Sequence, residues 1–411
     1  MFIKLYFLFL GFVSALALTP ITPLPLLISG CVLVGIFFLL LKNKIIIPIP
    51  STIKFIYSLI CILYVFGLLY SQGSMSTAIN HAAAYIIVII IYHVTISIGL
   101  ANSNLEERDV FSYLSKGVLL VVFIILIEFI SKNFFSFNLD SVIYRATVKE
   151  YMHTYNFGGS FFYRARGTME ESGPAAMYLL MFTPFLIYFF KVHMKNKKKA
   201  VFYTFSVLLA LLFTFSAIGF IELFISLFIC VFIYLFFDKR IHKELVKFKM
   251  TTIIYSHFLI AISVLILFLT KPWKGNFFEN IIKKATFSND IMSSQSRLTR
   301  WDLAFDLIQQ KPMLGWGPGY MSSVIGTGST SLYLDTAISY GLLGITLSLL
   351  VFGIYLVRIF RINGNKRYLF LFSFIVAMIH YTVISAIWFP WIWTLFALID
   401  FTILKEKKLQ R

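Results

Sequence analysis

The chain has 411 residues, of which 59% are hydrophobic, 18% aromatic and only 13% charged. Too little polar surface remains to cover soluble domains of that length, so a soluble globular protein is excluded and lipid is the expected solvent. The net charge of +18 does not indicate nucleic-acid binding, because the basic residues stand in short clusters between apolar runs. The three cysteines lie inside apolar runs without a CxxC pair, so neither a disulfide framework nor a zinc site is expected.

About 12 apolar segments are long enough, or nearly so, to cross the roughly 30 Å of bilayer hydrocarbon as helices. We therefore expect an all-α fold, a polytopic helical bundle. The expected spans are residues 5–18, 24–41, 55–70, 78–100, 117–130, 175–190, 201–215, 220–237, 253–270, 333–357, 368–387 and 391–404. The expected order is transmembrane helices 1 to 5 in residues 1–130, a long loop in 131–174, helices 6 to 9 in 175–270, a second long loop in 271–332, and helices 10 to 12 with a basic tail in 333–411.

Lysine and arginine gather in alternate connections, as short cytoplasmic loops require. Lys4 precedes the first span, and the basic connections contain residues 42–54, 191–199, 239–249, 358–367 and 405–411. The turns at 20–25 and 71–77 carry no charge, whereas the connection 101–116 is mixed, because Glu106, Glu107 and Asp109 offset Arg108 and Lys116. Both termini are therefore predicted to be cytoplasmic, and both long loops to lie outside. Residues near 150 and 290 should report the outer side, and residues near 195, 245 and 365 the inner side. The start of the chain resembles a signal peptide, but its removal would break the alternation.

The two long loops are the stretches polar enough to form a site on a membrane scaffold. A carrier would need ionisable groups near the midplane of the membrane. Here such groups lie toward the expected outer ends of the spans, namely Glu128, Glu222, Asp335, His81 and His380. Two interpretations stay open. These side chains are exposed to water at the membrane interface, or they form the floor of a cavity that opens to the outer side.

The first long loop ends in a basic motif that leads directly into a span. Arg164 and Arg166 precede Gly167 and Thr168, and a helix begins a few residues later. Guanidinium groups beside a helix amino end suit a phosphate, because forked donors and peptide N–H groups then point to the same place. Alternatively, the arginines pair with Glu170 and Glu171, or reach lipid headgroups.

The second long loop contains a predicted amphipathic helix that starts at a Ser296 cap. Its apolar stripe is formed by Leu298, Trp301, Phe305 and Ile308, and Arg297 and Arg300 share another face. Such a helix would lie at the membrane surface with its arginines at headgroup depth.

A glycine-rich turn is predicted directly after this helix. Pro312 should end the helix, and Gly315, Gly317 and Gly319 permit a close approach of the backbone. A generic interfacial helix followed by a tight turn is the alternative interpretation.

At these residues the chain resembles a known superfamily. The spacing from Arg297 to Trp301, followed by Pro312-Met313-Leu314-Gly315-Trp316-Gly317-Pro318-Gly319, is similar to the signature of the O-antigen ligases and O-antigen polymerases. Arg164 with Gly167-Thr168 resembles the other arginine motif of that superfamily, and Tyr340-Gly341-Leu342-Leu343-Gly344 resembles its glycine-rich entry to the span after the large loop.

The resemblance implies a GT-C type glycosyltransferase of the bacterial cytoplasmic (inner) membrane that works on the periplasmic face without a metal or another cofactor. The donor and the acceptor would both be undecaprenyl-diphosphate-linked glycans. Arg164, Arg166, Arg297 and Arg300 would bind the diphosphate, since fixed positive charge stabilises the leaving group. Glu170, Glu171 and Asp335 are the candidates for the base that deprotonates the acceptor hydroxyl, with His153 as the alternative. Membrane lipid and a chain-length-regulating membrane protein are the other expected partners.

Two departures from the superfamily favour a polymerase over a ligase. Ligases carry a histidine near the end of the large loop, where this chain reads Ser329-Thr330-Ser331, and the usual Ser-Arg at the turn between the seventh and eighth spans is Ser216-Ala217. Ligation to an acceptor such as lipid A core is the alternative. A lipid-linked glycan flippase is the alternative from another class, but a flippase should expose charge along a central passage, whereas here the charge gathers outside.

Overall fold

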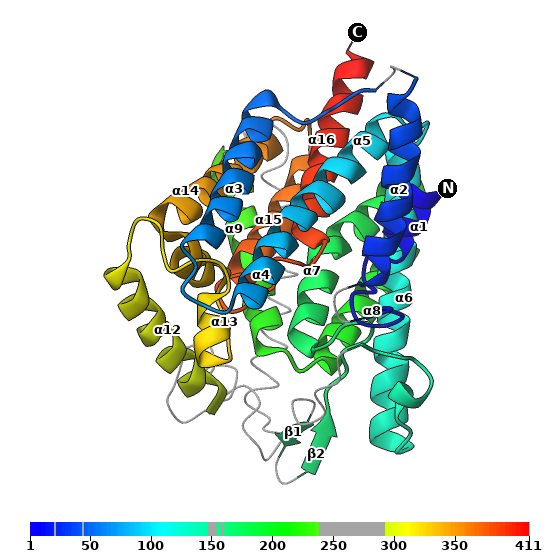
Figure 1. Cartoon of the computed structure of the whole chain (residues 1–411). Coiled ribbons are helices and arrows are strands. Elements are labelled where there is room, and N and C mark those ends of the chain that lie inside the picture. Colours follow the sequence, from blue (N-terminus) through cyan, green and yellow to red (C-terminus); the bar gives the residue numbers. More distant parts are fainter. Residues whose placement is uncertain (20–21, 43–44, 147–153, 158–159, 238–291, 411) are drawn as a thin grey trace.

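The computed structural model of the chain describes all residues except 20–21, 43–44, 147–153, 158–159, 238–291 and 411, and it is mostly helical (Figure 1). The α-helices are α1 (Phe2–Leu8), α2 (Leu24–Leu40), α3 (Ser51–Leu69), α4 (Met75–Ile87), α5 (Ile96–Ala101), α6 (Glu107–Phe134), α7 (Ser172–Tyr188), α8 (Lys197–Phe213), α9 (Ala217–Phe237), α12 (Met292–Gln310), α13 (Tyr320–Ile325), α14 (Leu332–Phe360), α15 (Lys366–His380) and α16 (Trp391–Leu409). Two π-helical segments, η1 (Val88–Thr95) and η4 (Phe189–His193), continue α4 and α7, and η2 (Leu139–Ser141) is a short 3₁₀ turn.

Six helices among the described residues are long and apolar enough to cross a membrane. They are Ser51–Leu69, Met75–Ala101, Glu107–Phe134, Ser172–His193, Ala217–Leu235 and Leu332–Phe360. The chain is thus a helical membrane protein, while the expected count of about twelve spans stays a prediction. Helix α2 is apolar but only 17 residues long, and the expected span 253–270 lies outside the described residues.

The N-terminal segment differs from the expected helix over residues 5–18, because α1 ends at Leu8. Beyond it the chain turns and bonds to the end of the first long loop. The Ser14 and Ala15 amides donate to the carbonyl oxygen of Thr168, at 3.2 and 2.9 Å, and the Thr168 hydroxyl donates to the carbonyl oxygen of Gly11. These contacts give the backbone partners that a continued helix would have supplied.

Figure 1 shows α12, α13 and the strands β1 and β2 toward the end of the bundle that lies opposite the C-terminus. Strand β1 (Thr154–Phe157) pairs antiparallel with β2 (Ser160–Tyr163), with Thr154 opposite Tyr163. The all-α expectation omitted this small pair, although its sequence is rich in aromatic residues that favour strands.

Helix α14 is broken near its start, and the glycine-rich turn after α12 completes its hydrogen bonds. Gly341 has φ of 62° and ψ of −159° inside the helix. The carbonyl oxygens that the break releases, those of Ile338 and Ser339, accept from the amides of Trp316 and Gly317 at 2.8 and 3.0 Å. The Leu342 amide donates in turn to the carbonyl oxygen of Pro312 at 2.8 Å. The two glycine-rich motifs therefore form one interlocked unit, in which a broken helix is satisfied by a neighbouring loop.

Helix α12 begins at Met292, so the predicted cap at Ser296 was wrong, but it ends at Gln310 as the following proline predicts. Its buried side chains are Ala304 and Leu307, which pack against α13 and α14. Phe305 of the predicted stripe is 52% exposed instead. The helix therefore packs against the protein through Ala304 and Leu307. This buried face is shifted by about one residue from the stripe that the sequence predicted.

Candidate functional site

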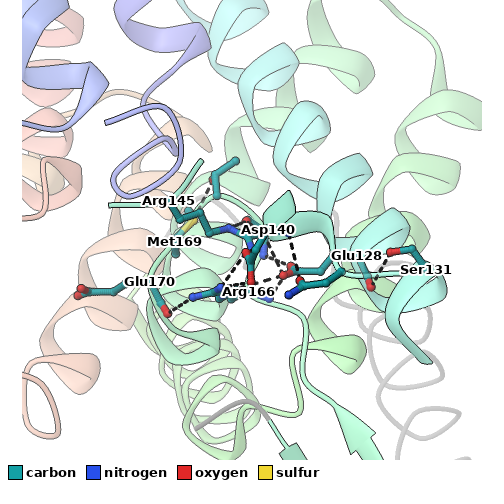
Figure 2. A network of polar contacts seen from close by, with 10 residues as sticks. Glu128, Ser131, Asp140, Arg145, Arg166, Met169 and Glu170 are labelled. Carbon is teal, nitrogen blue, oxygen red and sulfur yellow. Dashed lines mark hydrogen bonds and ion pairs between the residues drawn. The ribbon is translucent and has the colours of Figure 1, made fainter. Parts of the chain in front are cut away.

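The start of the Arg166-Gly167-Thr168 motif is enclosed in a cluster of two arginines and two carboxylates (Figure 2). The Nη2 atom of Arg166 lies 2.8 Å from each carboxylate oxygen of Asp140. Nη2 of Arg145 lies 2.9 Å from Oε1 of Glu128, and its Nη1 contacts Asp140 as well. The Arg166 side chain is only 1% exposed, so the cluster lies inside the fold.

Two guanidinium groups pair with two carboxylates in this cluster, and Lys132 adds a further positive charge near Asp140. Burial raises the pKa of the Asp140 carboxyl, but Arg145 and Arg166 outweigh it and hold this pKa below its ordinary value. The Arg166 guanidinium pairs with the carboxylates of Asp140 and Glu128, and these contacts position the motif. That Arg166 also binds the diphosphate stays a prediction.

The same cluster fixes the turn that follows Arg166. Oε2 of Glu128 accepts from the amides of Arg166 and Gly167 at 2.9 and 2.7 Å, and Nε of Arg145 donates to the carbonyl oxygen of Gly167 at 3.0 Å. Glu128 was expected near the outer end of its span, whereas Arg145 and Asp140 were not predicted to belong to a site. No periodic pattern marks those two residues, and only their charge in a loop that precedes a basic motif could have drawn attention to them.

Arg164 is half-buried and lies against the turn between α8 and α9. Its Nε donates to the carbonyl oxygen of Thr214 at 3.2 Å. This turn contains Ser216-Ala217, the place where the superfamily usually has an arginine. Arg164 thus brings a guanidinium to the turn from a different part of the chain.

Arg297 of α12 interacts electrostatically with Glu171, the residue that precedes α7. Burial lowers the pKa of Arg297, the Glu171 carboxylate opposes this shift, and the nearby Arg300 guanidinium adds to it, so that the pKa lies below its ordinary value. Glu171 and Arg297 are 126 positions apart in the sequence, yet the fold brings them to the same end of the bundle. The amino end of α7 and its peptide N–H groups lie beside this pair.

Glu170 has a different setting from its neighbour. Its carbonyl oxygen accepts from Nη1 of Arg166 at 3.3 Å, while Figure 2 shows its carboxylate pointing away from that guanidinium. The residue is half-buried. Its carboxylate thus points away from the ion pairs of Arg166 with Asp140 and Glu128.

Asp335 lies in the first turn of α14 and binds the segment that precedes this helix. Its Oδ1 accepts from the Ser329 amide at 2.8 Å. Asp335 also interacts electrostatically with His81 of α4. His81 borders the glycine-rich turn, because a Cβ on Gly319 would lie 2.8 Å from its ring. A half-buried histidine thus lies near Ser329-Thr330-Ser331, where ligases have theirs, although it comes from another part of the chain.

Glu222 and His380 form a buried pair beneath the amino end of α7. Nδ1 of His380 lies 2.5 Å from Oε1 of Glu222, and both side chains are at most 2% exposed. A Cβ on Gly173 would lie 3.9 Å from the His380 ring. The pair joins α9 to α15 and is too deeply enclosed to meet a substrate, which distinguishes it from the half-buried Glu170, Glu171 and Asp335.

The three glycines of the turn lie in close contact with other parts of the same chain. A Cβ on Gly315 would lie 2.4 Å from the carbonyl oxygen of Ile338, and one on Gly317 would lie 2.5 Å from Cα of Ser71. The turn is therefore a structural joint between α14 and the connection from α3 to α4. His153 lies outside the described residues, and within the described ones no group of three His, Cys, Asp or Glu is arranged to hold a metal ion.

Residues 200–349 match the family model described as O-antigen ligase. This match confirms the resemblance to the O-antigen ligase and polymerase superfamily. The matched range contains Arg297, the glycine-rich turn and the broken start of α14, and it supports an enzyme of glycan transfer. It ends before α15 and begins after Arg164. No curated protein matches the chain.

Proposed function

We propose that this chain is a surface polysaccharide polymerase that joins undecaprenyl-diphosphate-linked repeat units on the periplasmic face of the inner membrane. The observation that carries the proposal is the interaction of Arg297 with Glu171, since it unites the two loop motifs at the amino end of α7. Arg164 at the α8–α9 turn adds a second half-buried guanidinium at the same end of the bundle.

In the proposed reaction, the acceptor hydroxyl oxygen attacks the anomeric carbon of the donor glycan. The bond from this carbon to the diphosphate breaks, and the lipid diphosphate leaves with the electron pair. Arg297 and Arg164 stabilise the negative charge that develops on its oxygens. The proton of the acceptor hydroxyl passes to a base. We place Glu170 first among the candidates because its carboxylate points away from the Arg166 guanidinium (Figure 2), and Glu171, Asp335 and His81 are the others.

Ligation to an acceptor such as lipid A core is the second candidate, favoured by the description of the matching family. Deletion of the gene followed by gel display of the surface polysaccharide separates the two. Loss of a polymerase leaves a single repeat unit on its anchor, whereas loss of a ligase leaves none. A repeat unit stranded inside the cell would indicate a flippase and overturn both.

A further inference from the structure

A groove of about 690 Å³ runs along the outside of the bundle between the start of α3 and the second half of α14. Its wall is formed by Leu349, Leu350, Ile354 and Val357, and Gly353 leaves it open because no atom lies within 4 Å of the place of a Cβ. From Thr346 to Arg361 the groove follows 15 helical residues, about 22 Å at 1.5 Å per residue. One leaflet of bilayer hydrocarbon is about 15 Å thick, so an acyl chain fits along it.

One end of this groove is lined by Arg358 and Arg361. This end lies toward the C-terminus of the chain, away from α12 and α13 (Figure 1). Arg361 is exposed and has no ion-pair partner in the part of the chain that the structure describes. Arg358 is 11% exposed on its side chain, and its Nε is buried without a hydrogen-bond partner among the described residues. No acidic residue lines the groove, so its end carries net positive charge.

Arg358 is held in place by a buried network that reaches the interior of the bundle. Its Nη2 lies 2.5 Å from Oδ1 of Asp400, and Oδ2 of Asp400 lies 3.0 Å from Nε2 of His93. The hydroxyls of Tyr57 and Tyr355 each lie 2.8 Å from a ring nitrogen of His93. His93 belongs to η1, a π-helical segment of the kind that often accompanies functional sites.

Charged groups at membrane depth are costly, and they typically mark a functional site. The glycan-transfer site lies at the other end of the bundle and does not use this network. Asp400 balances Arg358, so one uncompensated charge, that of Arg361, faces the mouth of the groove. A lipid with one negative charge on its headgroup and an acyl chain complements both the positive charge of Arg361 and the elongated apolar wall of the groove.

We propose that this groove binds a membrane phospholipid with an anionic headgroup, one acyl chain lying along α14 and the phosphate contacting the exposed Arg361 guanidinium. The buried network holds Arg358 beside this contact. Basic pockets between transmembrane helices are known to bind acidic lipid headgroups. The proposal does not rest on the glycan-transfer function.

Native mass spectrometry of the purified full chain tests the proposal with phosphatidylglycerol and phosphatidylcholine of identical acyl chains. We expect the wild type to retain phosphatidylglycerol at about tenfold lower lipid concentration than phosphatidylcholine. Arg361→Gln should lose this preference, and Gly353→Leu, which fills the groove, should weaken the binding of both lipids. Monodisperse elution of each variant checks its folding.

Two matched controls separate the groove from general effects. Gly35→Leu places the same side chain on α2, where a Cβ likewise meets open space, and Lys198→Gln removes an exposed charge on α8. Both should bind as the wild type does. Equal retention of the two lipids by the wild type, or undiminished phosphatidylglycerol binding by Arg361→Gln and Gly353→Leu, would overturn the proposal. Retention of polyprenyl phosphate in place of phosphatidylglycerol would overturn it too, since the occupant would then be a substrate lipid.

Discussion

Nη2 of Arg166 lies 2.8 Å from both carboxylate oxygens of Asp140, in a cluster that Arg145 and Glu128 complete. Because the two guanidinium groups and the two carboxylates pair with one another, the removal of one group leaves its partners without their counter-charge. The cluster is thus the point at which the first long loop is fastened to α6.

We expect Arg166→Gln to lower the free energy of unfolding by about 3 to 5 kcal/mol, the usual cost of leaving one partner of a buried ion pair. Thermal unfolding of the purified protein in detergent measures the change. Arg164→Gln is the matched control, because Arg164 is half-buried, and its effect should be clearly smaller. Equal melting temperatures for Arg166→Gln and the wild type would show that the cluster does not hold the loop.

The joint between the glycine-rich turn and α14 gives a second prediction. Gly315→Ala should destabilise the fold strongly, because φ is 70° and the new methyl group would lie 2.4 Å from the carbonyl oxygen of Ile338. Gly364→Ala shares the left-handed backbone, with φ of 66°, but meets open space. It should cost only about 1 to 2 kcal/mol. Unfolding curves of the two variants separate the cost of the left-handed backbone from the cost of the steric clash with Ile338. Similar losses of stability in both variants would argue against the interlocked joint.

The sequence predicted the membrane class and the mostly helical fold, because long apolar segments favour helices in a bilayer. It did not predict that α1 would end at Leu8, since the segment that follows is held by Thr168 from a loop far along the chain. It did not indicate Asp140 and Glu128 as partners of Arg166, because these carboxylates reach it only in the folded protein.

The orientation in the membrane is a third prediction. Reporter fusions near residues 195 and 365 should show the inner side, and fusions near 150 and 290 the outer side, because the basic connections should stay in the cytoplasm. The first two positions adjoin α8 and α15, and the last two lie outside the described residues. Opposite sides for 150 and 290 would separate the two motifs and contradict a shared site.

A fourth prediction concerns the arginines proposed to bind the diphosphate. Arg297→Ala and Arg164→Ala should each reduce polymerisation about 100-fold to 1000-fold while the protein still inserts, because one donor to the developing charge is lost. Lysine at either position should restore only part of the rate, since an ammonium cannot grip two oxygens at once. Arg367→Ala, near the opposite end of the bundle, should leave the rate unchanged. Wild-type chain lengths in both alanine variants would refute the assignment.

The base is the last prediction, and the geometry favours Glu170. The Glu170 carboxylate points away from the Arg166 guanidinium (Figure 2). Glu171 interacts electrostatically with Arg297, and Asp335 accepts from the Ser329 amide, so replacing either one also disturbs a contact of its own. A base that is replaced by its amide keeps donor binding, while turnover falls about 100-fold to 10,000-fold. We expect this pattern for Glu170→Gln on purified lipid-linked repeat units.

The other variants should behave differently, and the difference identifies the base. Glu171→Gln should weaken donor affinity together with turnover, because Arg297 loses its counter-charge. Asp335→Asn should mainly lower stability, since it acts on the segment before α14. If Glu170→Gln keeps near-normal turnover, a carboxylate at this position is not the base. The half-buried His81, which borders the turn at Gly319, then becomes the group to replace, and His81→Gln should show the selective loss of turnover instead.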